Sequence, residues 1–112
     1  MNYVMIPRAL YTRYELTPTA REAYGLLRGR WDLSTKTPGF RDRLGVFCYY
    51  GRDELAGMLG VSLPTLRAAL RMLVSAGLIA IERQGQGKSD KIYVFRLPEE
   101  DIQDSGNVLR LR

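Results

Sequence analysis

The fold of this chain is decided by residues 51–77, GRDELAGMLGVSLPTLRAALRMLVSAG. Two helices are expected in this stretch, at residues 52–59 and 63–76, with only GVS between them. Ser62 stands where an N-cap side chain accepts amide hydrogens, and Gly77 stands where a C-terminal glycine ends a helix. Two helices joined by a turn of about three to four residues form a helix-turn-helix motif.

A longer amphipathic helix is expected before this motif, within LTPTAREAYGLLRGRWDLS at residues 16–34. Thr17 can cap this helix, and Pro18 suits its first position because the missing amide hydrogen would have no partner there. Apolar residues recur at helical spacing and predict one buried face, made of Ala20, Ala23, Tyr24, Leu27 and Trp31. Residues 33–45 are expected to form a polar loop, and VFCYY at residues 46–50 a strand.

Two strands are expected after the motif, LIAIERQ at residues 78–84 and KIYVFRL at residues 91–97, around the glycine-rich tip GQGKSD. The expected elements follow the order of a winged helix-turn-helix: helix, strand, short helix, turn, second helix, strand, flexible loop and strand. The predicted fold class is therefore α+β, with three main helices, a small antiparallel sheet and a glycine-rich wing. Residues 1–97 are expected to form this domain, and residues 98–112 a polar, slightly acidic tail or the start of a linker.

Composition excludes several classes of protein. The chain has 112 residues, of which 46% are hydrophobic and 26% charged, which is typical of one globular domain. Its single cysteine and its lack of histidine exclude an internal disulfide, an ordinary zinc site and a Ser–His or Cys–His nucleophile pair. We therefore expect no enzyme activity and no cofactor. No apolar run approaches the ~20 residues of a membrane span, and we expect a cytoplasmic protein that does not bind membranes.

Positive charge is concentrated in the predicted domain. Residues 1–97 hold fifteen Lys and Arg against eight Asp and Glu, whereas the remaining residues hold four acids against two arginines. A cationic surface favours polyanions such as nucleic acid, although positive charge also keeps a small protein soluble. Residues 55–81 contain no Asp or Glu at all, and this pattern favours the DNA interpretation.

The second helix of the motif has the features of a DNA recognition helix. Leu66, Ala69, Leu70 and Leu73 form its predicted buried stripe. Small side chains on the opposite face let the backbone approach the major groove, arginines can bond guanine edges, and methyl groups can meet thymine methyls. The predicted DNA contacts on this helix are Ser62, Pro64, Thr65, Arg67, Ala68 and Arg71. The alternative is a solvated face whose arginines serve helicity and solubility.

The loop between the last two strands has the composition of a DNA-contacting wing. Gly85 and Gly87 can adopt positive φ and allow close approach of the backbone. The predicted DNA contacts of the wing are Arg83, Gln84, Gln86, Lys88, Ser89 and Lys91. The alternative is a plain exposed hairpin turn, which Asp90 favours slightly.

The same loop contains GQGKS, which matches the second half of a phosphate-binding loop. The position of that motif's first glycine holds Glu82, whose carboxylate would repel a phosphate. A phosphate-binding loop also leads into a helix, whereas this loop leads into KIYVF at residues 91–95, which is a predicted strand. Both features disfavour a nucleotide site. The nucleotide hypothesis would be supported again if the substitution Lys88→Ala abolished ATP binding.

The aromatic residues Trp31, Tyr24, Phe47, Tyr49 and Tyr93 are expected in the core rather than in a base-stacking platform. Tyr49 and Tyr50 cannot both point inward on a strand, because neighbouring side chains alternate between its two faces. One of the two is therefore expected to be exposed or to contact a partner.

Three stretches match a family pattern. Ile6-Pro7 with Leu10 matches an IP-x-x-L opening, and Leu16-Thr17 with Ala20, Tyr24 and Leu27 matches an LS-x-x-A-x-x-x-Y-x-x-L helix. Residues 77–94 match GLI-x-x-x-RQG-x-G-x-x-x-x-IYV, the most specific of the three. Together they resemble the N-terminal domain of plasmid replication initiator A proteins over nearly all of residues 3–97. Thr17 replaces a common serine and Pro64 a more usual lysine, which removes one phosphate contact.

This resemblance implies a winged-helix domain that binds double-stranded DNA at repeated sites of a plasmid origin. It also implies a homodimer, for which the extended residues 2–6 offer a free edge, and host replication proteins engaged through a C-terminal region missing here. The chain is then expected to be the DNA-binding domain of a longer protein. The fold alone leaves two alternatives open, a transcriptional regulator and a protein-interaction module of a replication assembly.

Overall fold

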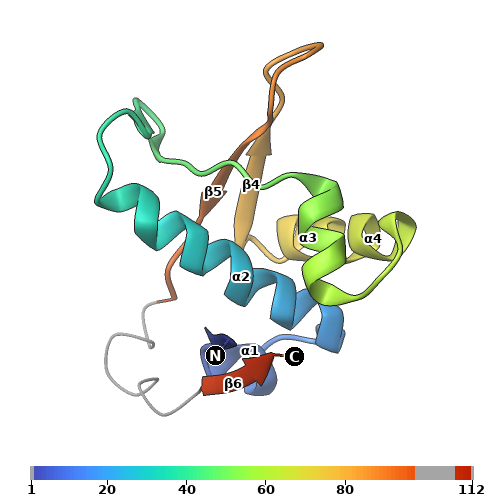
Figure 1. Ribbon diagram of the computed structural model, residues 1–112. Coiled ribbons are helices and arrows are strands. Elements are labelled where there is room, and N and C mark those ends of the chain that lie inside the picture. Colours follow the sequence, from blue (N-terminus) through green and yellow to red (C-terminus); the bar gives the residue numbers. More distant parts are fainter. Residues whose placement is uncertain (1, 98–107, 112) are drawn as a thin grey trace.

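The computed structural model describes residues 2–97 and 108–111 (Figure 1). Its helices are α1 (Ala9–Thr12), α2 (Pro18–Thr35), α3 (Arg52–Leu59) and α4 (Leu63–Ser75). Its strands are β1 (Asn2–Met5), β2 (Arg41–Asp42), β3 (Gly45–Val46), β4 (Ile79–Glu82), β5 (Lys91–Val94) and β6 (Val108–Leu111). They pair antiparallel as β1–β6, β2–β3 and β4–β5. The predicted α+β winged helix-turn-helix is confirmed, although its small sheet is divided into two-stranded pieces.

Helix α2 crosses the middle of the molecule and carries much of the core (Figure 1). Its N-terminus is capped as predicted, because the Thr17 hydroxyl accepts a hydrogen bond from the Ala20 amide at 3.2 Å. Ala20, Ala23, Tyr24 and Leu27 are buried, which confirms the predicted face. Trp31 is half-buried, and its Nε1 donates to the Val46 carbonyl at 2.9 Å.

Helices α3 and α4 form the helix-turn-helix and meet at 98°. Gly60 ends α3 in the left-handed conformation, with φ of 70°, and the Ser62 hydroxyl accepts the Thr65 amide at 3.3 Å to begin α4. The predicted stripe of α4 is buried in full: Leu66, Ala69, Leu70 and Leu73. No single helix in the described ranges is long and apolar enough to cross a membrane, although α3 and α4 reach that length and composition together.

The wing, which we define as β4, β5 and the loop between them, continues directly from α4. Gly77, with φ of 76°, turns the chain, and the Leu78 amide donates to the Leu73 carbonyl at 3.0 Å. In the wing Ile79 pairs with Val94 and Glu82 with Lys91. The short left-handed turn therefore fixes how the wing stands relative to α4.

Two expectations for residues 33–50 are wrong. The predicted polar loop is the last turn of α2 followed by the β2–β3 hairpin, in which the Asp42 carboxylate accepts the Leu44 amide at 2.8 Å. The predicted strand at residues 46–50 is limited to Val46, the end of β3, and an isolated bridge at Cys48. That bridge has two backbone hydrogen bonds to Ile92, at 2.8 and 2.9 Å, so at this point the segment lies antiparallel beside β5.

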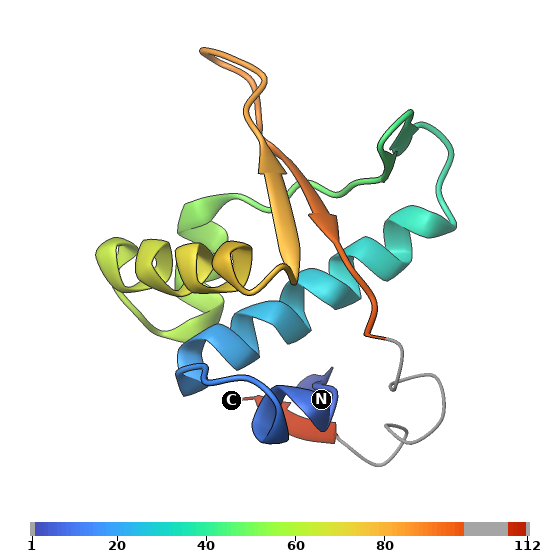
Figure 2. The ribbon, with the colours of Figure 1, turned by 180° about the vertical axis from the view of Figure 1, so that it is seen from behind.

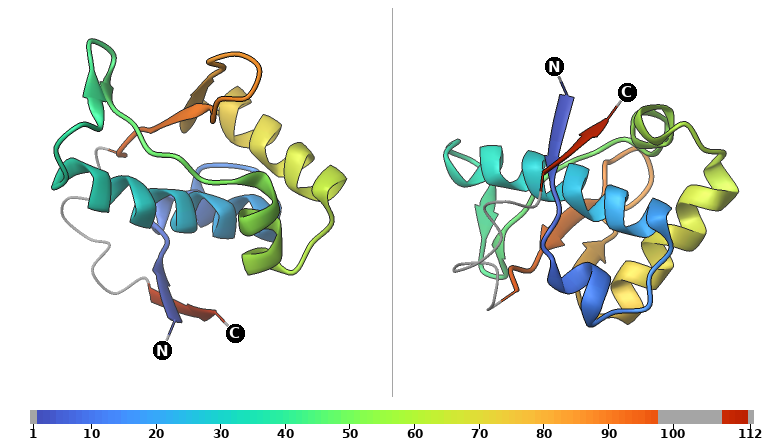
Figure 3. Two further views of the ribbon diagram at one scale, coloured as in Figure 1. Left: turned by 45° about the horizontal axis from the view of Figure 1, so that its top comes forward. Right: turned by 90° about the horizontal axis from the view of Figure 1, so that it is seen from below.

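The two chain ends lie side by side, because β1 and β6 pair with Asn2 opposite Leu111 (Figure 3). Strand β6 falls within the stretch expected to be a tail or linker, and it occupies one edge of β1. Residues 98–107 of that expected tail lie outside the described residues. The boundary at residue 97 therefore stays a prediction.

Candidate nucleic-acid interface

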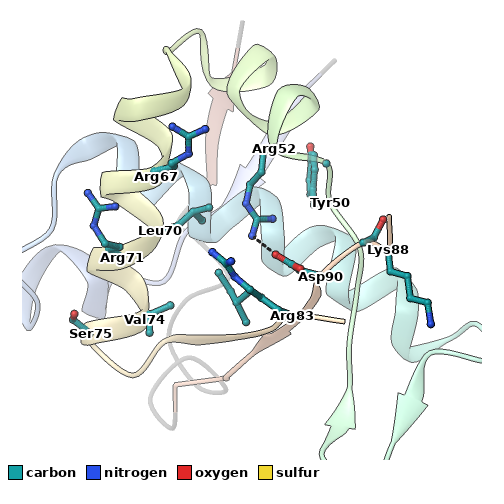
Figure 4. A pocket seen from close by; sticks show the side chains of 13 residues that line it. Tyr50, Arg52, Arg67, Leu70, Arg71, Val74, Ser75, Arg83, Lys88 and Asp90 are labelled. Atoms are coloured by element: carbon teal, nitrogen blue, oxygen red, sulfur yellow. Dashed lines mark hydrogen bonds and ion pairs between the residues drawn. The ribbon is translucent and has the colours of Figure 1, made fainter. Parts of the chain in front are cut away.

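A groove of about 680 Å³ lies between the outer face of α4 and the wing (Figure 4). The start of α3 and the segment before it close its third side. The groove is lined by Tyr50, Gly51, Arg52, Arg67, Leu70, Arg71, Val74, Ser75, Ile81, Arg83, Lys88, Ser89 and Asp90. Five of these residues are basic and one is acidic, so the groove presents net positive charge.

Helix α4 contributes Arg67 and Arg71, which project from the same side of the helix in Figure 4. Both are exposed, as are the other predicted contacts of this helix: Ser62, Pro64, Thr65 and Ala68. The buried leucine stripe holds the opposite face against the core, so the orientation of the arginines follows from the helical period. The Ser62 hydroxyl, besides capping α4, donates to the Thr65 hydroxyl at 3.0 Å.

The wing tip has the backbone geometry predicted for it. Gly85 and Gly87 have φ of 111° and 79°, a backbone conformation that residues other than glycine rarely adopt. The Lys88 amide donates to the Gly85 carbonyl at 3.2 Å and closes the turn. Figure 4 shows Arg83 facing the groove and Lys88 pointing away from α4. Four predicted contacts of the wing are exposed: Arg83, Gln86, Lys88 and Ser89.

The side chains of the other two predicted wing contacts are half-buried and contact other residues of the protein. The Gln84 amide donates to the Ser89 carbonyl at 2.9 Å and to the Tyr49 hydroxyl at 3.4 Å, bracing the base of the loop. The Lys91 ammonium lies 2.8 Å from an Asp42 carboxylate oxygen and 4.6 Å from the centre of the Phe47 ring. Lys91 therefore faces the β2–β3 hairpin, whereas Gln84 faces the wing loop and Tyr49.

Arg52 and Tyr50 line the groove, and neither is among the residues predicted from the sequence to contact DNA. Arg52, the first residue of α3, forms an ion pair with Asp90 of the wing at 3.1 Å (Figure 4). The pair ties α3 to the wing, and it neutralises the carboxylate that appeared unfavourable for DNA. The two residues are 38 positions apart, so no local pattern could have linked them.

Arg30 of α2 positions the segment that closes the groove. Its guanidinium donates to the Tyr49 carbonyl at 2.9 Å and lies 3.9 Å from the centre of the Tyr50 ring. It also pairs with Glu54 of α3 at 3.1 Å. Tyr50 is buried and Tyr49 half-buried, so the expectation that one of the two is exposed is not met. Neither residue lies on a strand, because β3 ends at Val46, and their side chains need not alternate.

Four aromatic rings pack between the wing and the β2–β3 hairpin: Phe40, Phe47, Tyr49 and Tyr93. The Tyr93 hydroxyl contacts carboxylates of Asp42 at 2.8 Å and Glu82 at 3.1 Å. Burial, together with these two hydrogen bonds, raises the pKa of Tyr93. The hydroxyl therefore stays protonated and donates. The part of the chain that the structure describes holds no group of three or more Cys, Asp and Glu placed to bind a metal ion.

Hydrogen bonds from Lys91 and then Tyr93 lower the pKa of Asp42 from 3.8 to about 2. Because this carboxyl is more acidic in the folded state, its contribution to stability is present above pH 3.8 and is lost as the pH falls toward 2. We therefore expect wild type to be more stable than Asp42→Asn by a constant margin near neutral pH. This margin should shrink as the pH falls from 3.8 to about 2. Thermal unfolding of both proteins as a function of pH measures it, and a margin unchanged at pH 2 would contradict this assignment.

A family model described as replication initiator protein A (RepA) N-terminus matches residues 2–105. A search of curated proteins gave no match.

Several solved structures are similar to this chain. One, described as "Structure of Rep-DNA complex", has a TM-score of 0.70 and 28% identity, over 88% of this chain and 80% of that chain. Another, described as "N-Terminal domain of DNA binding protein", has a TM-score of 0.68 and 28% identity, over 87% and 78%. A third, described as "Structure of MDR initiator", shares the fold at 22% identity and a TM-score of 0.60, over 86% and 75%.

Proposed function

The chain belongs to the replication initiator protein A N-terminal family, and we propose that it binds double-stranded DNA sequence-specifically at repeated sites of a plasmid origin. The observation that carries this proposal is the basic groove between α4 and the wing. A structure 28% identical to this chain is described as a Rep–DNA complex, which supports the same assignment.

In the proposed complex α4 enters the major groove and the wing follows the adjacent backbone. Arg67 and Arg71 are exposed on one side of α4, and arginine bonds guanine edges through its two parallel donors. Thr65 and Ala68 offer methyl groups on the same helix. Lys88, at the wing tip, contributes a point charge for phosphates and carries no sequence information.

The assembly is also part of the proposal. A homodimer would bind a pair of repeated half-sites, because a twofold protein matches a twofold arrangement of sites. One edge of β1 is paired with β6, so pairing across the dimer through residues 2–6 would use the other edge. Host replication proteins would be engaged by a region outside this chain.

The test is a fluorescence-anisotropy titration at several salt concentrations. It compares a random duplex with duplexes that the domain has selected from a random pool. Tight binding to an enriched repeated motif, with affinity falling steeply as salt rises, supports a sequence reader at an origin. Weak, unselective binding would instead favour a protein-interaction module, and an enriched motif that occurs at promoters rather than at an origin would favour a transcriptional regulator.

Asp90→Asn is expected to raise the affinity for any duplex severalfold. The change removes the one acid of the groove and releases Arg52, which then adds about one phosphate contact and steepens the salt dependence by roughly 0.9 in log–log slope. Anisotropy titrations at several salt concentrations measure both quantities.

Asp53→Asn is the matched control, because Asp53 is an exposed acid in the first turn of α3 that does not line the groove. It loses the same charge and should change affinity less. Equal gains for both variants would mean that overall charge is responsible and not the groove.

A further inference from the structure

The β2–β3 hairpin, with the turn that contains Arg43 and Leu44, stands beside the wing. In Figures 1 and 2 it rises from the C-terminal end of α2, on the same side of α2 as the wing tip. In order across this face lie α4, the wing and the hairpin. The groove described above accounts for the first two of these and leaves the hairpin without a role.

The basic side chains of this hairpin face solvent, and its acidic side chain faces the wing. Arg41 and Arg43 are exposed, whereas Asp42 between them is half-buried against the wing. Asp42 is bound by Lys91 at 2.8 Å, so its charge is matched within the protein. Lys36, at the end of α2, is also exposed. Besides the apolar side chain of Leu44, which is 62% exposed, the hairpin therefore presents positive charge to solvent.

The hairpin is fixed to the wing and not merely near it. The Lys91 ammonium and the Tyr93 hydroxyl, both from β5, converge on the same Asp42 oxygen at 2.8 Å. The Phe47 ring packs against Tyr93 with centroids 6.1 Å apart, and Cys48 is paired to Ile92 through the backbone. A surface held this way loses little conformational entropy on binding, because its orientation is already set.

We propose that the β2–β3 hairpin is a second wing, whose Arg41 and Arg43 bind backbone phosphates that flank the sequence read by α4. This inference rests on the proposed function, because the duplex must first be held by α4 and the first wing. Arginine forks suit phosphate oxygens, and such contacts add affinity and salt dependence without adding base specificity. Gly45, with φ of 123°, allows the tight turn of this hairpin, because residues other than glycine rarely adopt that conformation.

The test compares two duplexes that carry the selected motif. The short duplex ends at the last informative base pair, and the long one extends by about ten base pairs, one helical turn, on each side. Wild type is expected to bind the long duplex about tenfold tighter, with a salt slope steeper by roughly two, since each phosphate contact contributes about 0.9. Arg41→Ala/Arg43→Ala is expected to bind both duplexes with equal affinity.

Two further variants control this result. Arg41→Lys/Arg43→Lys keeps the charge and should keep most of the gain from the flanks. Lys88→Ala should weaken binding to both duplexes alike and leave their ratio unchanged. If wild type prefers the motif but binds both duplexes equally, or if the double alanine variant keeps the gain, the second wing is refuted and the proposed function stands. If wild type shows no preference for the motif over a random duplex, the proposed function fails and the second wing with it.

Discussion

Leu66→Ala is expected to lower the free energy of unfolding by about 2–5 kcal/mol. Leu66 is fully buried in the core, on the face of α4 opposite the groove. Truncation removes its transfer free energy and leaves a cavity that a packed interior fills only in part. Because domains of this size are marginally stable, the loss is a large share of the total, typically 5–15 kcal/mol.

Urea or thermal unfolding followed by circular dichroism measures the change. Val74→Ala is the matched control, since Val74 lies on the same helix but is 44% exposed. Surface substitutions of this kind usually change stability by less than about 0.5 kcal/mol. Similar losses for the two variants would contradict the role given to the buried stripe, because alanine has the higher helix propensity at both positions and cannot itself cause a loss.

Arg71→Ala is expected to cost about 1–3 kcal/mol in binding to the selected motif and to relax specificity at one base pair. Arg71 is exposed on the groove side of α4, and the described part of the chain provides no acid on this helix to compete for it. The loss should be concentrated at the base pair that the guanidinium contacts. Titrations against the motif and its single-base variants measure it.

Lys88→Ala provides the contrast within the same interface. It should weaken binding to all sequences alike and lower the salt slope by about one. Folding is not expected to change, because Lys88 is exposed at the tip of the wing. A uniform loss for Arg71→Ala, or a sequence-dependent loss for Lys88→Ala, would contradict the roles given to α4 and the wing.

The sequence predicted those elements whose signals are local. Helix α4 is an example: its Ser62 cap, its leucine stripe and Gly77 all lie within sixteen consecutive residues. The exposed positions of Arg67 and Arg71 followed directly, because an amphipathic helix has one buried face and a fixed period. The glycines of the wing were equally informative, since positive φ at Gly85 and Gly87 strongly favours that residue type.

The sequence did not predict contacts between residues that lie far apart along the chain. The alternation of β5 alone cannot tell that Lys91 meets Asp42, because the two are 49 positions apart. The same limit applies to Arg52 and Asp90. The β2–β3 hairpin was not predicted for another reason, because its short strands carry too few residues for a period to be visible. The role of Lys91 as a DNA contact therefore stays a prediction, and the structure adds that its ammonium pairs with Asp42.

By itself, then, the sequence determined the order of elements, the winged helix-turn-helix, and the face of α4 that turns outward. These depend on helical period, caps and glycine conformations, which neighbouring residues specify. Only the tertiary structure decided which cations remain exposed, how the wing is tied to α3, and that a second hairpin stands beside it. Those features depend on charge pairs and ring packing between segments that come together only when the core formed by α2 and α4 brings them within contact distance.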